Sequence, residues 1–168
     1  MDMPEDQHAL YAEFGITAEK AQVLETEAGN VALSYVTLFV NTDEITPELT
    51  EIFRSVNDDV NRKTLGALLK HLKTRLNFDD SITNVIDEAL KQRNYLTHHF
   101  FRTHNFALFS EDGRKLMLAE LKEIQPILDK AHTTLHHICQ ILGQIAGREG
   151  LSNEQALHFQ NRGKKVNI

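Results

Sequence analysis

The chain of 168 residues has one cysteine, Cys139, and only three prolines and eight glycines. A single cysteine excludes an internal disulfide framework and a multi-cysteine zinc site. So few prolines and glycines argue against a β-sandwich with many turns and favour long helices. A chain of this length buries most of its apolar surface without disulfides or metals. The composition therefore indicates an ordinary globular protein.

Long apolar segments are also missing. No run approaches the roughly 18 residues that a membrane-spanning helix needs. The first residues, MDMPEDQHAL, are acidic and lack the apolar centre of a secretory signal. We therefore expect a cytoplasmic protein without a membrane partner.

Charge is acidic in sum but unevenly distributed. The net charge of −6 argues against general electrostatic binding to nucleic acid or anionic membrane. Residues 61–105, however, carry eight basic and four acidic side chains and four of the nine histidines. A polyanion would meet the protein there; the alternative is a scatter of solvated helix charges.

Apolar residues recur at helical spacing along the chain, without the alternation typical of strands. This pattern predicts an all-α fold, a single bundle of four to five main helices with short terminal helices. We expect one domain, 1–168, in which a helix within 1–15 and a tail at 162–168 are peripheral. The expected helices cover 4–14, 18–40, 47–57, a segment from 64, a segment from about 80, 111–146 and a short segment after 152.

Boundary signals place the ends of these helices. Gly15 is expected to end the first helix, and Thr17 to cap the second. Asp79 and Ser110 precede apolar-periodic segments and are expected N-caps. Pro126 should kink the longest helix because it removes a backbone donor. The apolar stripe of that helix is expected to include Leu116, Leu121, Ile124, Leu128, Leu135, Ile138 and Leu142.

Arg93 has an unusual place in the segment ALKQRNYLTHHFFRTH. On an ideal helix it falls within about 20° of Ile82, in the middle of the apolar stripe. A guanidinium keeps its proton and is costly to bury unpaired. Arg93 must therefore face a cleft, a ligand, a partner surface or a carboxylate, for which Glu25 and Glu27 are candidates.

The run Arg93-Asn94-Tyr95-Leu96-Thr97-His98 resembles the R-(N/D/H)-x-x-x-H motif of the HEPN superfamily, and the strings EFGITAEKAQVLE and KTLGALLKHLK are similar to a branch of it. HEPN proteins are small helical bundles. Many are metal-independent endoribonucleases in toxin–antitoxin and phage-defence systems. The resemblance implies an RNase that needs no metal and no cofactor.

The resemblance assigns a role to each motif residue. His98 acts as base or acid near the ribose 2′-hydroxyl, and Arg93 clamps the phosphate oxygens. Asn94, one turn before His98, orients the imidazole or binds the phosphate. His99 and Arg102 are accessory candidates. DNA, which lacks the 2′-hydroxyl, is not an expected substrate.

Arg93 and His98 lie about 140° apart on a regular helix, so one chain does not present them side by side. In the family the site forms at a dimer interface, which implies a homodimer with Arg93 of one chain near His98 of the other. Tyr95, Phe100 and Phe101 are candidates for packing across that interface; ordinary core residues are the alternative.

Two other functions remain open. The same bundle could be a non-catalytic interaction module, paired with an antitoxin or a nucleotidyltransferase-like partner. The acidic charge outside 61–105 favours that reading. His132 and His136 have the i, i+4 spacing with which a helix chelates a metal, although solvated surface histidines are the default and no metal site is expected.

Overall fold

The computed structural model describes residues 3–38, 51 and 65–147. In these residues every regular element is helical, and the prediction of an all-α bundle is confirmed. The α-helices are α1 (Glu5–Thr37), α3 (Leu65–Arg75), α4 (Asp80–His98), α5 (Phe100–Thr103) and α6 (Glu111–Ile145), and a 3₁₀ helix, η1, covers Ala107–Phe109.

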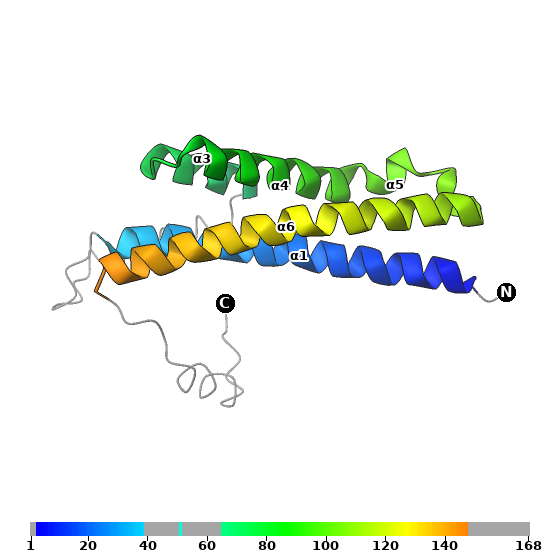
Figure 1. The fold of residues 1–168 in the computed structure, drawn as a ribbon, viewed down its shortest axis with the longest axis horizontal. Helices are drawn as coiled ribbons and strands as arrows, with labels where there is room; N and C mark the ends of the chain where they lie inside the picture. The colour runs from blue at the N-terminus through cyan, green and yellow to red at the C-terminus, as the bar shows by residue number, and fades with distance from the viewer. Residues whose placement is uncertain (1–2, 39–50, 52–64, 148–168) are drawn as a thin grey trace, which may run out of the picture.

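The two longest helices, α1 and α6, lie side by side and run in the same direction (Figure 1). Polar pairs join the two helices along their whole length, and the two partners of each pair are 105 to 112 positions apart in the sequence. A constant separation requires parallel helices, because in an antiparallel pair one partner's number would fall as the other's rises. The pairs are Asp6–Arg114, Glu13–Gln125, Lys20–Asp129, Glu27–His136 and Ser34–Cys139.

Helix α4 runs against α1 and α6 and carries the candidate motif at its far end (Figure 1). Phe14 packs on Phe100. Glu25, which follows Phe14 along α1, contacts Arg93, which precedes Phe100 in the chain. Residue numbers on the α4 side fall as those on α1 rise, so α4 is antiparallel to α1. The motif therefore lies beside the middle of α1, between Phe14 and Glu25.

Local signals place the starts of α4 and α6 where they were predicted. Asp79 caps α4, its carboxylate accepting from the Ile82 amide at 2.9 Å. Hydrogen bonds from Ser81 and the Ile82 amide lower the pKa of the Asp79 carboxyl. Ser110 caps α6 in the same way, accepting from the Gly113 amide at 3.1 Å. Both N-cap predictions are confirmed.

The prediction that a separate first helix ends at Gly15 is wrong. Helix α1 continues through this position without a break. Thr17 is no N-cap: its side chain is fully buried and its hydroxyl donates to the Glu13 carbonyl at 2.8 Å, one turn back. Gln125 of α6 also donates to the Thr17 hydroxyl, at 3.0 Å. The local sequence around Gly15 favours a helix end, but packing against α6 keeps this stretch helical.

The core is a set of apolar stripes that meet between α1, α3, α4 and α6. The stripe of α6 differs from the predicted one at its start, where Met117 is fully buried and Leu116 is 58% exposed. Helix α6 continues as one helix through Pro126. The buried residues of α6 are Met117, Leu121, Ile124, Leu128, Ala131, Leu135 and Leu142.

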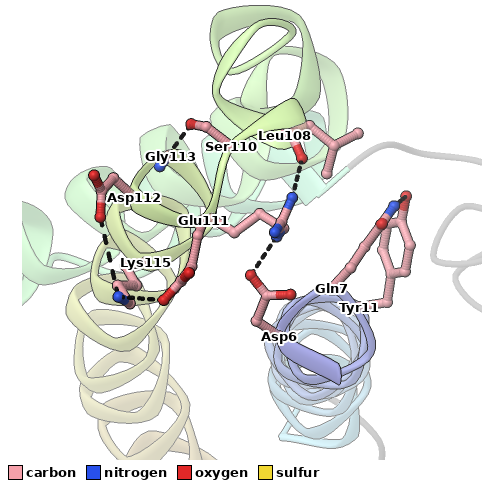
Figure 2. A network of polar contacts seen from close by, with 10 residues as sticks. Asp6, Gln7, Tyr11, Leu108, Ser110, Glu111, Asp112, Gly113 and Lys115 are labelled. Atoms are coloured by element: carbon pink, nitrogen blue, oxygen red, sulfur yellow. Dashed lines mark hydrogen bonds and ion pairs between the residues drawn. The ribbon is translucent and has the colours of Figure 1, made fainter. Parts of the chain in front are cut away.

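Polar contacts hold the first turns of α1 and α6 together (Figure 2). Arg114 donates to the Asp6 carboxylate at 2.5 Å and to the Leu108 carbonyl at 3.0 Å. The hydrogen bond from Arg114 lowers the pKa of the Asp6 carboxyl. This contact ties η1, which follows the motif segment, to both long helices.

Some predictions fall outside the described residues. These are most of the helix expected at 47–57, the helix after 152 and the tail at 162–168. Among the described helices, none combines the length and apolar character that crossing a membrane would require.

Candidate functional site

The motif residues occupy the last two turns of α4. The helix is regular up to His98, and the backbone changes direction at His99, with φ −127° and ψ −27°. Helix α5 begins at the next residue. Because α4 is unbroken between Arg93 and His98, the separation of about 140° around the helix applies. A single chain therefore points these two side chains in different directions.

Arg93 faces α1 and is paired within its own chain. Its Nη2 atom donates to Glu25, and its Nη1 atom donates to the Asn94 side-chain oxygen at 3.1 Å. The Arg93 side chain is 20% exposed and that of Glu25 34%. Of the two carboxylates proposed from sequence, Glu25 is the partner. Glu27 instead accepts from Asn30 at 2.9 Å and contacts His136.

His98, His99 and Arg102 are all exposed. The rings of His98 and His99 lie edge to face, with centroids 6.3 Å apart. Within the described part of the chain, no hydrogen bond or ion pair engages the side chains of these three residues. Their polar atoms are open to a ligand or to a second protein copy.

A pocket of about 270 Å³ lies beside Arg93, between α1 and α4. These two helices pack against each other less extensively than either packs on α6, so the seam between them opens toward solvent. The pocket is lined by Phe14, Ala18, Ala21, Gln22, Glu25, Arg93, Leu96 and Thr97. The arginine on the apolar stripe therefore faces both a carboxylate and a cleft.

The motif aromatics belong to the core rather than to an exposed surface. Phe100 is fully buried, and Tyr95 and Phe101 are partly buried against the core. The expectation of an exposed aromatic run is therefore wrong, and for Phe100 the alternative of an ordinary core residue is confirmed. The exposed aromatics near the motif are Phe106 and Phe109, with 82% and 81% of their surface accessible.

A buried polar cluster next to the motif was missed by sequence reasoning. His104 is 7% exposed, and its Nε2 atom lies 2.5 Å from a carboxylate oxygen of Glu120 on α6. The Tyr95 hydroxyl lies 3.4 Å from the same nitrogen. Burial, together with the Glu120 carboxylate, raises the pKa of the Tyr95 hydroxyl. No local spacing links His104 to Glu120, so no signal in the sequence pointed to this contact.

The pair His132 and His136 lies on α6 with its rings stacked, centroids 6.2 Å apart. The Nδ1 atom of His136 lies 3.0 Å from Glu27, and its Nε2 atom lies 3.1 Å from Gln140. Both ring nitrogens of His136 are thus engaged by protein groups. Among the described residues, no three potential ligands gather around one point.

A larger hollow of about 450 Å³ lies between α4 and α6 and is lined by Asn84, Val85, Glu88, Pro126, Ile127 and Lys130. Its carboxylate, Glu88, already accepts from Gln92 at 2.7 Å and pairs with Lys91 at 3.7 Å. The hollow contains no motif residue. The candidate site therefore rests on the end of α4 and the pocket beside Arg93.

Comparison of the chain with family models, curated proteins and solved structures finds no match. The candidate site consists of a paired arginine at a pocket, an adjacent asparagine, and an exposed histidine on the following turn.

Proposed function

We propose that the chain is a HEPN-like, metal-independent endoribonuclease that acts as a homodimer through Arg93, Asn94 and His98. The observation that carries the proposal is the environment of Arg93. A mostly buried guanidinium is held at the edge of a pocket, and the unengaged ring of His98 follows on the last turn of the same helix.

The chemistry needs only these side chains and the substrate. His98 accepts the proton of the ribose 2′-hydroxyl as its oxygen bonds to phosphorus. The bond from phosphorus to the 5′-oxygen breaks, and that oxygen takes a proton from water. Arg93 has five N–H donors, of which Glu25 and Asn94 engage one each. Donors therefore remain to stabilise the charge on the phosphorane oxygens.

A dimer is required because one chain separates Arg93 from His98 around α4. A two-fold axis near the end of α4 would bring Arg93 of one copy toward His98 of the other. Phe106 and Phe109 support this arrangement, since two nearly uncovered aromatic rings directly after the motif segment favour burial in an interface.

Cleavage of single-stranded RNA in the presence of EDTA tests the proposal. We expect products with a 2′,3′-cyclic phosphate and a 5′-hydroxyl, and no cleavage of DNA. His98→Ala should lower the rate by about 10²- to 10⁴-fold, and Arg93→Ala should be at least as severe. His99→Ala should be milder.

His137→Ala is the matched control. This exposed histidine lies toward the opposite end of α6 and should leave the rate unchanged. Activity that survives both Arg93→Ala and His98→Ala would contradict the proposal, as would intact RNA after incubation with folded wild-type protein.

The second candidate function is a non-catalytic interaction module that binds an antitoxin or a nucleotidyltransferase-like protein. The pairing of Arg93 with Glu25 favours it, because an arginine with its own carboxylate has a structural reason to be there. The net charge of −6 also opposes general RNA binding. A folded dimer that leaves RNA intact would support this function.

A further inference from the structure

The pocket beside Arg93 has an apolar floor suited to a flat ring. Ala21 and Leu96 are buried, and Phe14 and Ala18 are partly buried. The Phe14 ring packs against the Phe101 ring, with centroids 4.8 Å apart. At about 270 Å³ the pocket lies just under the range for drug-sized ligands, so it suits one small planar group.

The polar residues of the pocket carry compensating charges. Glu25 and Arg93 form an ion pair, so the lining has no net charge and favours a neutral ligand over a free phosphate. Arg93 contacts only one oxygen of Glu25, its Oε1 atom. Within the described residues, the other oxygen of Glu25 and the side-chain amide of Gln22 have no hydrogen-bond partner.

A carboxylate selects among the nucleobases by the donors on their edges. Guanine offers two adjacent donors, N1–H and N2–H, which match the two oxygens of one carboxylate. Adenine and cytosine offer an amino group beside a ring acceptor, and uracil offers one N–H between two carbonyl oxygens that a carboxylate repels. The face of a base also packs well on apolar and aromatic side chains.

We infer that this pocket binds an unstacked guanine of single-stranded RNA, with Glu25 reading its Watson–Crick edge and Gln22 as an additional hydrogen-bonding group. The inference rests on the proposed function for its substrate class, RNA. It adds base selection to that function: cleavage occurs next to guanine. The base enters between α1 and α4, while its phosphate remains outside at the Arg93 guanidinium.

Binding of nucleoside monophosphates to the full chain tests the inference without relying on catalysis. The four monophosphates have the same phosphate, so differences in affinity report the base. We expect GMP to bind about tenfold or more tightly than UMP. Chemical shifts of the Gln22 side-chain amide and the Thr97 backbone amide should change on titration with GMP.

Glu25→Gln should reduce the preference for GMP over UMP to about threefold or less, because an amide replaces one acceptor with a donor. Ala18→Met fills the pocket without changing its polar groups and should abolish GMP binding. This variant tests the pocket even if Glu25→Gln fails to fold. Glu123→Gln, at an exposed position on α6 outside the pocket, should bind as wild type does.

Equal affinity for GMP and UMP, or a GMP preference that survives Ala18→Met, would overturn the inference. RNA cleavage in EDTA without preference for guanine would also overturn it while leaving the proposed function intact. GMP binding at Gln22 by a protein that cleaves no RNA would support the pocket and overturn the proposed catalysis.

Discussion

At the residue scale, Arg93 shows how one charged side chain constrains its surroundings. Its position on the apolar stripe of α4 requires a partner, because an unpaired guanidinium in the interior is very costly. The structure supplies Glu25, 68 positions away on α1. The requirement follows from helical spacing within α4, but the identity of the partner depends on which face of α1 meets α4.

Tyr95, His104 and Glu120 form the other notable group at this scale. They connect α4, the turn after α5, and α6. Because His104 is buried, its imidazole depends on Glu120 and Tyr95 for hydrogen bonds. This cluster holds the motif segment against α6.

The raised pKa of Tyr95 predicts an effect at alkaline pH. Burial, with Glu120 beside it, makes the folded state hold the phenolic proton more firmly than the unfolded state, whose ordinary value is 10.0. The contribution to stability is therefore complete below pH 10 and is lost as pH rises through the raised pKa. Tyr95→Phe cannot ionise and should lose less stability in this range.

Thermal unfolding at a series of pH values from neutral to above 10 measures this difference. Tyr11→Phe, at an exposed position on α1, is the matched control and should follow the wild-type curve. A Tyr95→Phe curve parallel to wild type above pH 10 would show that the phenol does not titrate differently in the two states.

At the element scale, α1 is the clearest case of packing overriding a local signal. Gly15 favours a helix end, yet the helix continues past it while α6 packs along its length. Thr17 and Gln125 form one of the contacts between the helices at this level. A glycine inside a helix is destabilising because its backbone loses more freedom than that of alanine.

Gly15→Ala should therefore stabilise the protein by about 0.5–1 kcal/mol. A Cβ atom at this position meets nothing within 4 Å. Gly113→Ala is the opposite case, because its Cβ would lie 2.1 Å from the Ala107 carbonyl oxygen, and it should destabilise. Urea unfolding of both variants measures whether the free energy of unfolding rises or falls in each. A loss of stability in Gly15→Ala would show that α1 is not continuous.

At the scale of the whole molecule, the arrangement of helices separates the motif residues within one chain. The proposed dimer makes each active site from two chains, Arg93 from one and His98 from the other. Two inactive variants should then complement each other, because a mixed dimer of Arg93→Ala and His98→Ala contains one intact site.

Co-refolding equal amounts of these variants should recover about a quarter of wild-type activity, since half of the dimers are mixed and each has one of two sites. Replacing the Arg93→Ala chain with a chain that carries both substitutions removes the one remaining His98 of the mixed dimer and should recover nothing. Light scattering that shows a monomer at micromolar concentration, or a mixture without recovery, would contradict the composite site.

The sequence by itself determined the features that depend on neighbours within about four positions. These include the all-α class, the caps at Asp79 and Ser110, and the need of Arg93 for a partner. Each follows from helical periodicity or from a side chain reaching its own backbone.

Only the tertiary structure decided the rest. It placed α1 parallel to α6, kept α1 helical through Gly15, selected Glu25 over Glu27, and brought His104 to Glu120. These outcomes depend on how whole helix faces fit together, and that fit is a property of many distant side chains at once. The pocket beside Arg93 has the same origin, because it forms where α1 and α4 pack less extensively than either packs on α6.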